Sequence, residues 1–153
     1  MEIVEYQEKY KKDFIELNTQ WVERYFVMEQ ADREVLEHVE ELLKTGAMIY
    51  FAVENGKVLA TCMAMPLGAD VWEICKLAAS GQYTGTGAGS AVFKASMDYA
   101  VAQGAKKLTL ISNRRLKPAL HIYEKFGFRE VPLNKAYWGF DRADIEFEYI
   151  VAE

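Results

Sequence analysis

Residues 82–90 read Gln-Tyr-Thr-Gly-Thr-Gly-Ala-Gly-Ser, and residues 91–103 continue with apolar side chains at helical spacing. Glycine lacks the side chain that would keep a ligand away from the backbone. Several backbone N–H groups and the positive end of the following helix dipole can therefore face one anion. The stretch predicts a phosphate-binding turn at the start of a helix, and the ligand that we expect there is a phosphorylated cofactor.

Two common nucleotide-binding motifs do not fit this turn. A Rossmann fingerprint requires a third glycine, where Ser90 stands, and an acidic residue about 20 positions later at the end of a second strand. A P-loop ends in Gly-Lys-Ser or Gly-Lys-Thr, but no lysine lies between Lys76 and Lys94. Both motifs are excluded, so the sequence around the turn has to identify its type.

That sequence contains two motifs in a fixed order. An apolar strand at 72–79 precedes residues 83–92, which form the turn and the start of the helix. A second strand at 107–113 precedes residues 116–128, which read Leu-Lys-Pro-Ala-Leu-His-Ile-Tyr-Glu-Lys-Phe-Gly-Phe. The first motif is similar to the pyrophosphate loop of the Gcn5-related N-acetyltransferase (GNAT) superfamily. The second resembles that family's strand, asparagine and Ala-x-x-x-Tyr-x-x-x-Gly-Phe ending, and the match covers about two-fifths of the chain.

This resemblance implies a fold, a reaction and a cofactor. The fold would be one α/β (α+β) domain over residues 1–153, with a mixed sheet of six or seven strands and about four flanking helices. The reaction would be acetyl transfer from acetyl-CoA to a primary amine of a small molecule or a peptide. A non-catalytic CoA-binding or regulatory module with the same fold is the alternative, because fold does not determine function.

The resemblance also assigns residues to the cofactor. The strand backbone at Leu77, Ala78 and Ala79 would pair with the pantetheine arm as an added strand. Asn113, which is equally compatible with an ordinary turn residue, would bind the same arm, together with Ala119 and Tyr123. The turn that would hold the pyrophosphate consists of Thr84, Gly85, Thr86, Gly87, Ala88, Gly89 and Ser90.

Thr84 departs from the family pattern. The pattern is Arg or Gln, two residues, Gly, one residue, and then Gly or Ala, and Thr84 occupies its first position. A frame shifted by two residues would place Gln82 there, but it moves the following helix two residues out of register. With Thr84 in place, the glycines and amides remain while a long polar contact to the pyrophosphate is lost.

Tyr123 and Glu73 are the candidates for proton transfer. The resemblance places Tyr123 near the cofactor sulfur, and a phenol with an ordinary pKa of about 10 can give a proton to a departing thiolate. Tyr123 also shares a helix face with apolar residues, so a core role is the alternative. Glu73 could accept the amine proton, although glutamates on half-exposed strands are more often solvated. His38 and His121 are weaker candidates, because the expected helices direct them elsewhere.

The acceptor site is expected outside these motifs, where aromatic and charged residues gather at the junction of the first two helices and in the last loop. Such clusters are more often core than binding site, but loops of this kind commonly form pocket walls. The residues are Trp21, Arg24, Tyr25, Phe26, Glu29 and Asp32 in the first cluster and 137–142 in the second.

Composition limits the partners. The chain has 153 residues, 51% of them hydrophobic, and a formal net charge of −5, which disfavours nucleic acid and anionic membranes and suits a cationic amine. Neither a membrane-spanning run nor a signal-peptide pattern is present, so we expect a cytoplasmic protein. The sequence leaves open whether the chain forms a homodimer. Cys62 and Cys75 lie in apolar strand patterns, so we expect buried free thiols and no metal site.

Periodicity predicts the remaining elements. Asn55-Gly56 between two apolar runs is a strong hairpin signal. Pro118 and Gly127 suit the start and end of a helix, because Pro at the first turn loses no helical hydrogen bond and Gly accepts the conformation that ends one. The expected helices are 8–25, 32–44, 91–103 and 118–127, and the expected strands beyond those above are 2–6, 48–53, 58–65, 128–131 and 144–151.

Overall fold

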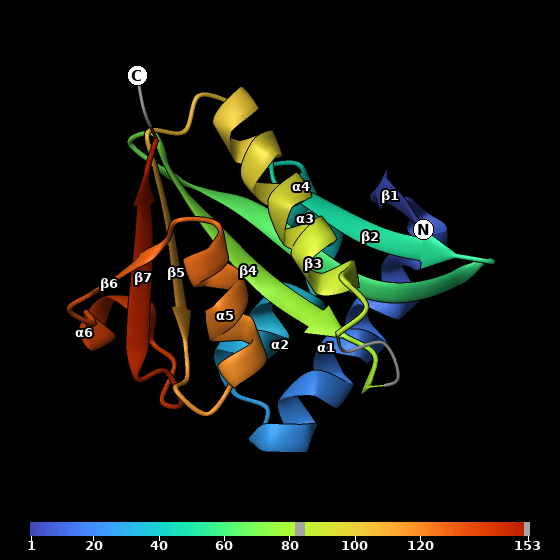
Figure 1. The fold of residues 1–153 in the computed structure, drawn as a ribbon, viewed down its shortest axis with the longest axis horizontal. Coiled ribbons are helices and arrows are strands. Elements are labelled where there is room, and N and C mark those ends of the chain that lie inside the picture. The colour runs from blue at the N-terminus through green and yellow to red at the C-terminus, as the bar shows by residue number, and fades with distance from the viewer. Residues whose placement is uncertain (82–84, 152–153) are drawn as a thin grey trace.

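The computed structural model describes residues 1–81 and 85–151, and within these ranges one mixed sheet carries helices on both faces (Figure 1). The strand order is β1-β2-β3-β4-β5-β7-β6, and every neighbouring pair is antiparallel except β4 and β5. The strands are β1 (Glu2–Glu5), β2 (Met48–Glu54), β3 (Lys57–Gly68), β4 (Val71–Ala79), β5 (Lys107–Ser112), β6 (Arg129–Val131) and β7 (Ile145–Ile150). The helices are η1 (Glu8–Tyr10), α1 (Lys11–Tyr25), α2 (Gln30–Leu36), α3 (Val39–Leu43), α4 (Ala88–Ala102), α5 (Lys117–Lys125) and α6 (Lys135–Trp138). The α/β class with a mixed sheet is confirmed.

The two faces of the sheet have separate cores. Helices α4 and α5 cover one face, where Phe93 and Tyr123 pack with strand residues such as Leu108 (Figure 1). Helices α1, α2 and α3 cover the other face, and Phe14 and Val39 are completely buried there. Burial of these apolar faces is the main favourable contribution to folding. The sheet is thus held between two helical layers.

The hairpin at Asn55 and Gly56 forms as predicted. Both residues have positive φ angles, 51° and 78°, and Glu54 pairs with Lys57. Two consecutive positive φ angles are what a tight two-residue hairpin turn requires.

The helix predicted over 32–44 is wrong in one respect, because the chain leaves the helical conformation between α2 and α3. His38 has φ −128° and ψ 35°, and it separates the two short helices. No glycine or proline stands at this point, so the sequence carries no local signal for the break. Leu36 and Val39, on either side of the break, both enter the same core, and tertiary packing therefore outweighs the helical pattern. The described residues contain six α-helices rather than about four.

Strands β4 and β5 diverge, and this opens the sheet. Their parallel pairing joins residues 71–73 to residues 107–109, whereas β5 stays paired with β7 as far as Ser112. Strand β4 also carries one residue more than β3 in the ladder between Ala78 and Cys75, and Lys76 in this bulge has φ +54°. A bulge bends its strand and redirects a side chain. The cavities of the molecule lie at this divergence.

Candidate functional site

A groove of about 530 Å³ lies between the C-terminal end of β4, the N-terminus of α4 and one face of α5. Most residues that the sequence assigns to the cofactor contribute to it. They are Leu77, Ala78, Ala79, Gly85, Gly87, Gly89, Ser90 and Ala119.

The start of α4 directs backbone donors into this groove. The first helical hydrogen bond runs from the Ala91 N–H to the Gly87 carbonyl at 3.0 Å, so the preceding N–H groups in the first turn have no helical acceptor. The Ala88 N–H lies 3.4 Å from the Thr86 hydroxyl, and Ala88 itself is completely buried. Gly85 and Gly87 have φ angles of 88° and 90°, and a Cβ on either would point into open space. The backbone is therefore accessible, as predicted, while Thr84 and the alternative Gln82 lie outside the described residues.

Three basic side chains that sequence reasoning did not assign to the cofactor also line this groove. Lys117, His121 and Lys125 are spaced four residues apart on α5, which places them on one face of the helix. The helical spacing of these basic residues within the second motif is the signal that could have identified them. His121 had been expected to point elsewhere.

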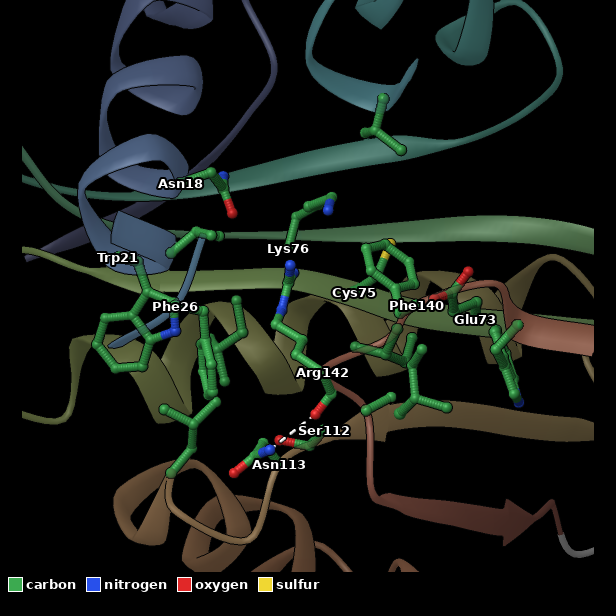
Figure 2. Close-up of a pocket in the computed structure, with 18 of the residues that line it drawn as sticks. Asn18, Trp21, Phe26, Glu73, Cys75, Lys76, Ser112, Asn113, Phe140 and Arg142 are labelled. Carbon is green, nitrogen blue, oxygen red and sulfur yellow. Dashed lines mark hydrogen bonds between the residues drawn. The ribbon is translucent and has the colours of Figure 1, made fainter. Parts of the chain in front are cut away.

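A second cavity of about 210 Å³ lies where β4 and β5 separate (Figure 2). Trp21 and Leu77 line both this cavity and the groove. The two spaces therefore adjoin. Of the residues predicted for an acceptor site, Trp21, Phe26, Trp138, Phe140 and Arg142 form its walls. Arg24 instead packs beside Gly81.

Tyr123 belongs to the core and to the second cavity at the same time. Its ring lies between Phe93 and Phe147, with centroid distances of 5.4 and 5.5 Å. The residue also lines the cavity, with 7% of its surface exposed. Burial raises the pKa of the phenol, and a hydrogen bond with the Ser112 side chain only partly opposes this. The hydroxyl is therefore protonated at neutral pH, and it is a weaker acid than a free phenol.

Glu73 lines the same cavity from β4 (Figure 2) and is 8% exposed, so the expectation of a solvated strand glutamate is wrong. Helices α1 and α2 and the segment after α6 cover this part of the sheet, which the strand pattern alone could not show. Burial raises the pKa of Glu73 to about 7, and the charge of Lys76 opposes the shift. A carboxyl group with this pKa exchanges a proton near neutral pH.

Asn113 lines the second cavity but uses its amide to hold two loops together. Its Nδ2 donates to the Arg142 carbonyl at 2.7 Å, as the dashed line in Figure 2 shows. Its Oδ1 accepts from the Arg115 N–H at 2.9 Å. Asn113 thus acts as a turn residue here, and its contact with a cofactor stays a prediction.

Four charged side chains form a cluster beside the second cavity, namely Glu29, Asp32, Lys76 and Arg142. The Arg142 guanidinium donates to both Asp32 carboxylate oxygens at 2.6 and 2.7 Å, and Lys76 donates to Asp32 at 3.0 Å. Arg142 also donates to Glu29 at 3.2 Å. Burial alone would raise the pKa of Asp32, but the bonds from Arg142 and the charge of Lys76 hold it well below its usual range. The positions of Lys76 and Asp32, 44 residues apart, gave no sign of this pairing in the sequence.

A family model described as "Acetyltransferase (GNAT) family" matches residues 10–128. Curated proteins gave no match. Among solved structures, an acetyltransferase of the GNAT family from Staphylococcus aureus Mu50 superposes with a TM-score of 0.86 at 19% identity, covering 97% of this chain and 98% of that one.

Two further structures are similar over almost their whole length. YncA of Salmonella typhimurium, solved with its cofactor acetyl-CoA, has a TM-score of 0.79 at 15% identity and covers 100% of this chain and 95% of its own. A ribosomal-protein-alanine N-acetyltransferase of Brucella melitensis has a TM-score of 0.80 at 14% identity, with 99% and 100% coverage. The three likenesses establish the same fold. In residues 1–81 and 85–151, none of the helices has the length and apolarity that a bilayer crossing requires.

Proposed function

Because this chain belongs to the acetyltransferase (GNAT) family, we propose that it transfers an acetyl group from acetyl-CoA to the primary amine of an acceptor. The observation that carries the proposal is the pair of adjoining cavities. One presents backbone N–H donors at a helix N-terminus, and the other holds a buried phenol and a buried carboxyl group. Acetyl-CoA in the groove and an amine in the second cavity would lie on either side of Leu77 and would meet at the bend of β4.

The groove fits the phosphorylated end of CoA. A helix N-terminus with accessible backbone donors is suited to a pyrophosphate, and glycines at positive φ allow close approach. Lys117 and Lys125 supply positive charge beside it in a chain whose net charge is −5. The solved structure of YncA with acetyl-CoA supports this choice of ligand. When bound there, acetyl-CoA supplies a thioester carbon as the electrophile.

The second cavity contains two groups that could carry out the proton transfers of the reaction. Glu73 would take the proton that the amine loses as its nitrogen forms the new amide bond, directly or through water. Tyr123 would give a proton to the sulfur as the carbon–sulfur bond breaks. The backbone N–H groups of residues 77–79 in β4, which line the groove, would supply a donor for the developing oxyanion. One proton is taken and one is given, so the net charge of the protein is unchanged by the step, and exchange with solvent then returns Glu73 and Tyr123 to their starting protonation states.

The experiment is a two-part measurement on the purified protein. Calorimetry should detect binding of acetyl-CoA, and release of free thiol in the presence of a panel of primary amines should detect turnover. Acetylated product should be identified by mass spectrometry. Binding without turnover on any amine would assign the chain to a non-catalytic CoA-binding module, and absence of CoA binding would overturn the proposal.

A further inference from the structure

The walls of the second cavity are aromatic on several sides. Trp21 and Phe26 approach from α1 and the residue after it, and Phe140 approaches from the segment between α6 and β7 (Figure 2). Trp138, the last residue of α6, also lines the cavity. A cavity of about 150 Å³ with apolar walls is large enough for benzene. The cavity here, about 210 Å³, therefore has room for a single ring and a short chain.

The basic groups of this cavity are already neutralised. Of the described residues that line it, only Lys76 and Arg142 are basic. Both donate to Asp32, whose side chain is 1% exposed, and Arg142 also bonds to Glu29. An entering carboxylate would have to compete with these two acids for their cations. Each basic side chain among the described lining residues thus already has an acidic partner.

Two buried polar groups of the cavity can accept hydrogen bonds from an amine. Asn18 is 3% exposed, and its Nδ2 is committed to the Phe14 carbonyl at 2.9 Å. Its oxygen points into the cavity (Figure 2). Glu73, the one lining acid among the described residues, adds a carboxyl group from the opposite end. A ligand with donors and a positive charge satisfies these atoms, whereas a ligand with a carboxylate leaves them facing an anion.

From these three observations we infer that the acceptor is a small aromatic primary monoamine without a carboxylate, with its ring between the aromatic walls and its amine toward Glu73. This inference rests on the proposed acetyl transfer and narrows it to one class of acceptor. Amino acids, polyamines and aminoglycosides are excluded as good acceptors, the first by their carboxylate and the others by their size or polarity.

The test compares acceptors that differ in one group. With saturating acetyl-CoA, kcat/KM should be measured for 2-phenylethylamine, for phenylalanine, which adds only a carboxylate, and for spermidine and kanamycin. We expect 2-phenylethylamine to exceed phenylalanine by at least about 100-fold, as expected when a buried charged group lacks a partner. Equal or better turnover of phenylalanine, spermidine or kanamycin would overturn the inference and leave acetyl transfer intact. Turnover of no amine by a protein that binds acetyl-CoA would overturn both.

A variant tests the charge argument directly. Asp32→Asn removes the acid that neutralises Lys76 and Arg142, so it should raise the phenylalanine to 2-phenylethylamine ratio by about tenfold or more. The matched control is Asp70→Asn, an exposed acid in the turn between β3 and β4, which should leave the ratio unchanged. A ratio that does not move in a folded Asp32→Asn protein would contradict the inference. If that variant fails to fold, the comparison of acceptors on the wild type still decides the matter.

Discussion

Replacing Glu73 by Gln should stabilise the protein, and the gain should grow with pH. Burial raises the pKa of Glu73 from 4.5 to about 7, against the opposing charge of Lys76. The folded protein therefore binds this proton more tightly than the unfolded chain does. The resulting stability is fully present below pH 4.5 and is lost as the pH rises through 7. Gln is nearly isosteric and remains neutral, so it avoids the cost of a buried charge.

The size of the effect follows from the two pKa values. The step from 4.5 to about 7 corresponds to about 3 kcal/mol, at roughly 1.4 kcal/mol per pH unit. The advantage of Gln should be less than about 1 kcal/mol near pH 5 and should approach about 3 kcal/mol near pH 8.5. Urea denaturation of the wild type and Glu73→Gln at several pH values measures this difference. Glu34→Gln, at an exposed position of α2, controls for the loss of one negative charge.

A stability difference that stays constant with pH would refute the idea that Glu73 is a buried acid with a raised pKa. The same variant also tests the catalytic role. If Glu73 takes the amine proton, Glu73→Gln should lower turnover by about 10²–10⁴-fold. A variant that is stabilised at high pH but fully active would confirm the burial and assign the proton to another group.

Four further changes test the remaining assignments. Tyr123→Phe should lower turnover by about 10²–10⁴-fold with little change in melting temperature or CoA affinity, and unchanged turnover would leave the residue a core role alone. Gly89→Val should abolish CoA binding in calorimetry while the protein stays folded, and unchanged affinity would mean that CoA does not approach the first turn of α4. Thr84→Arg should tighten CoA binding by about 1–3 kcal/mol, whereas no gain would favour Gln82 in that role. Asp32→Ala should cost about 3–5 kcal/mol in urea denaturation because it leaves the half-buried Lys76 without its acid and leaves Arg142 with Glu29 alone, and a loss below about 1 kcal/mol would contradict that account.

Local chemistry explains which features could be predicted from the sequence. The hairpin at Asn55-Gly56 and the turn before α4 depend on glycines and their immediate neighbours, so a short stretch of sequence determines them. The break at His38 and the burial of Glu73 depend on what other elements pack against them, and no local pattern records this.

The pairing within the charge cluster could not be predicted from the sequence. Arg142 and Asp32 are 110 residues apart and meet only because α2 and the segment after α6 cover the same part of the sheet. Both had been placed in the candidate acceptor region, but their pairing, and the participation of Lys76, had not been foreseen. The positive φ of Lys76 in the bulge of β4 is a tertiary feature as well.

The chain from Trp138, the last residue of α6, to Arg142 is held by side chains at both ends and by its backbone between them. Trp138 donates from its Nε1 to Glu146 at 3.0 Å, and Arg142 is fixed by Asp32. Between them the Asp141 N–H donates to Glu29 at 2.7 Å, and the Asp141 carbonyl accepts from Lys135 at 2.9 Å. This span includes Phe140, a wall of the second cavity, and it lies beyond residues 10–128, where the family model matches. Because these bonds hold the backbone in place, replacing the side chain of Phe140 can reshape the cavity for a different acceptor while the groove at α4 stays unchanged.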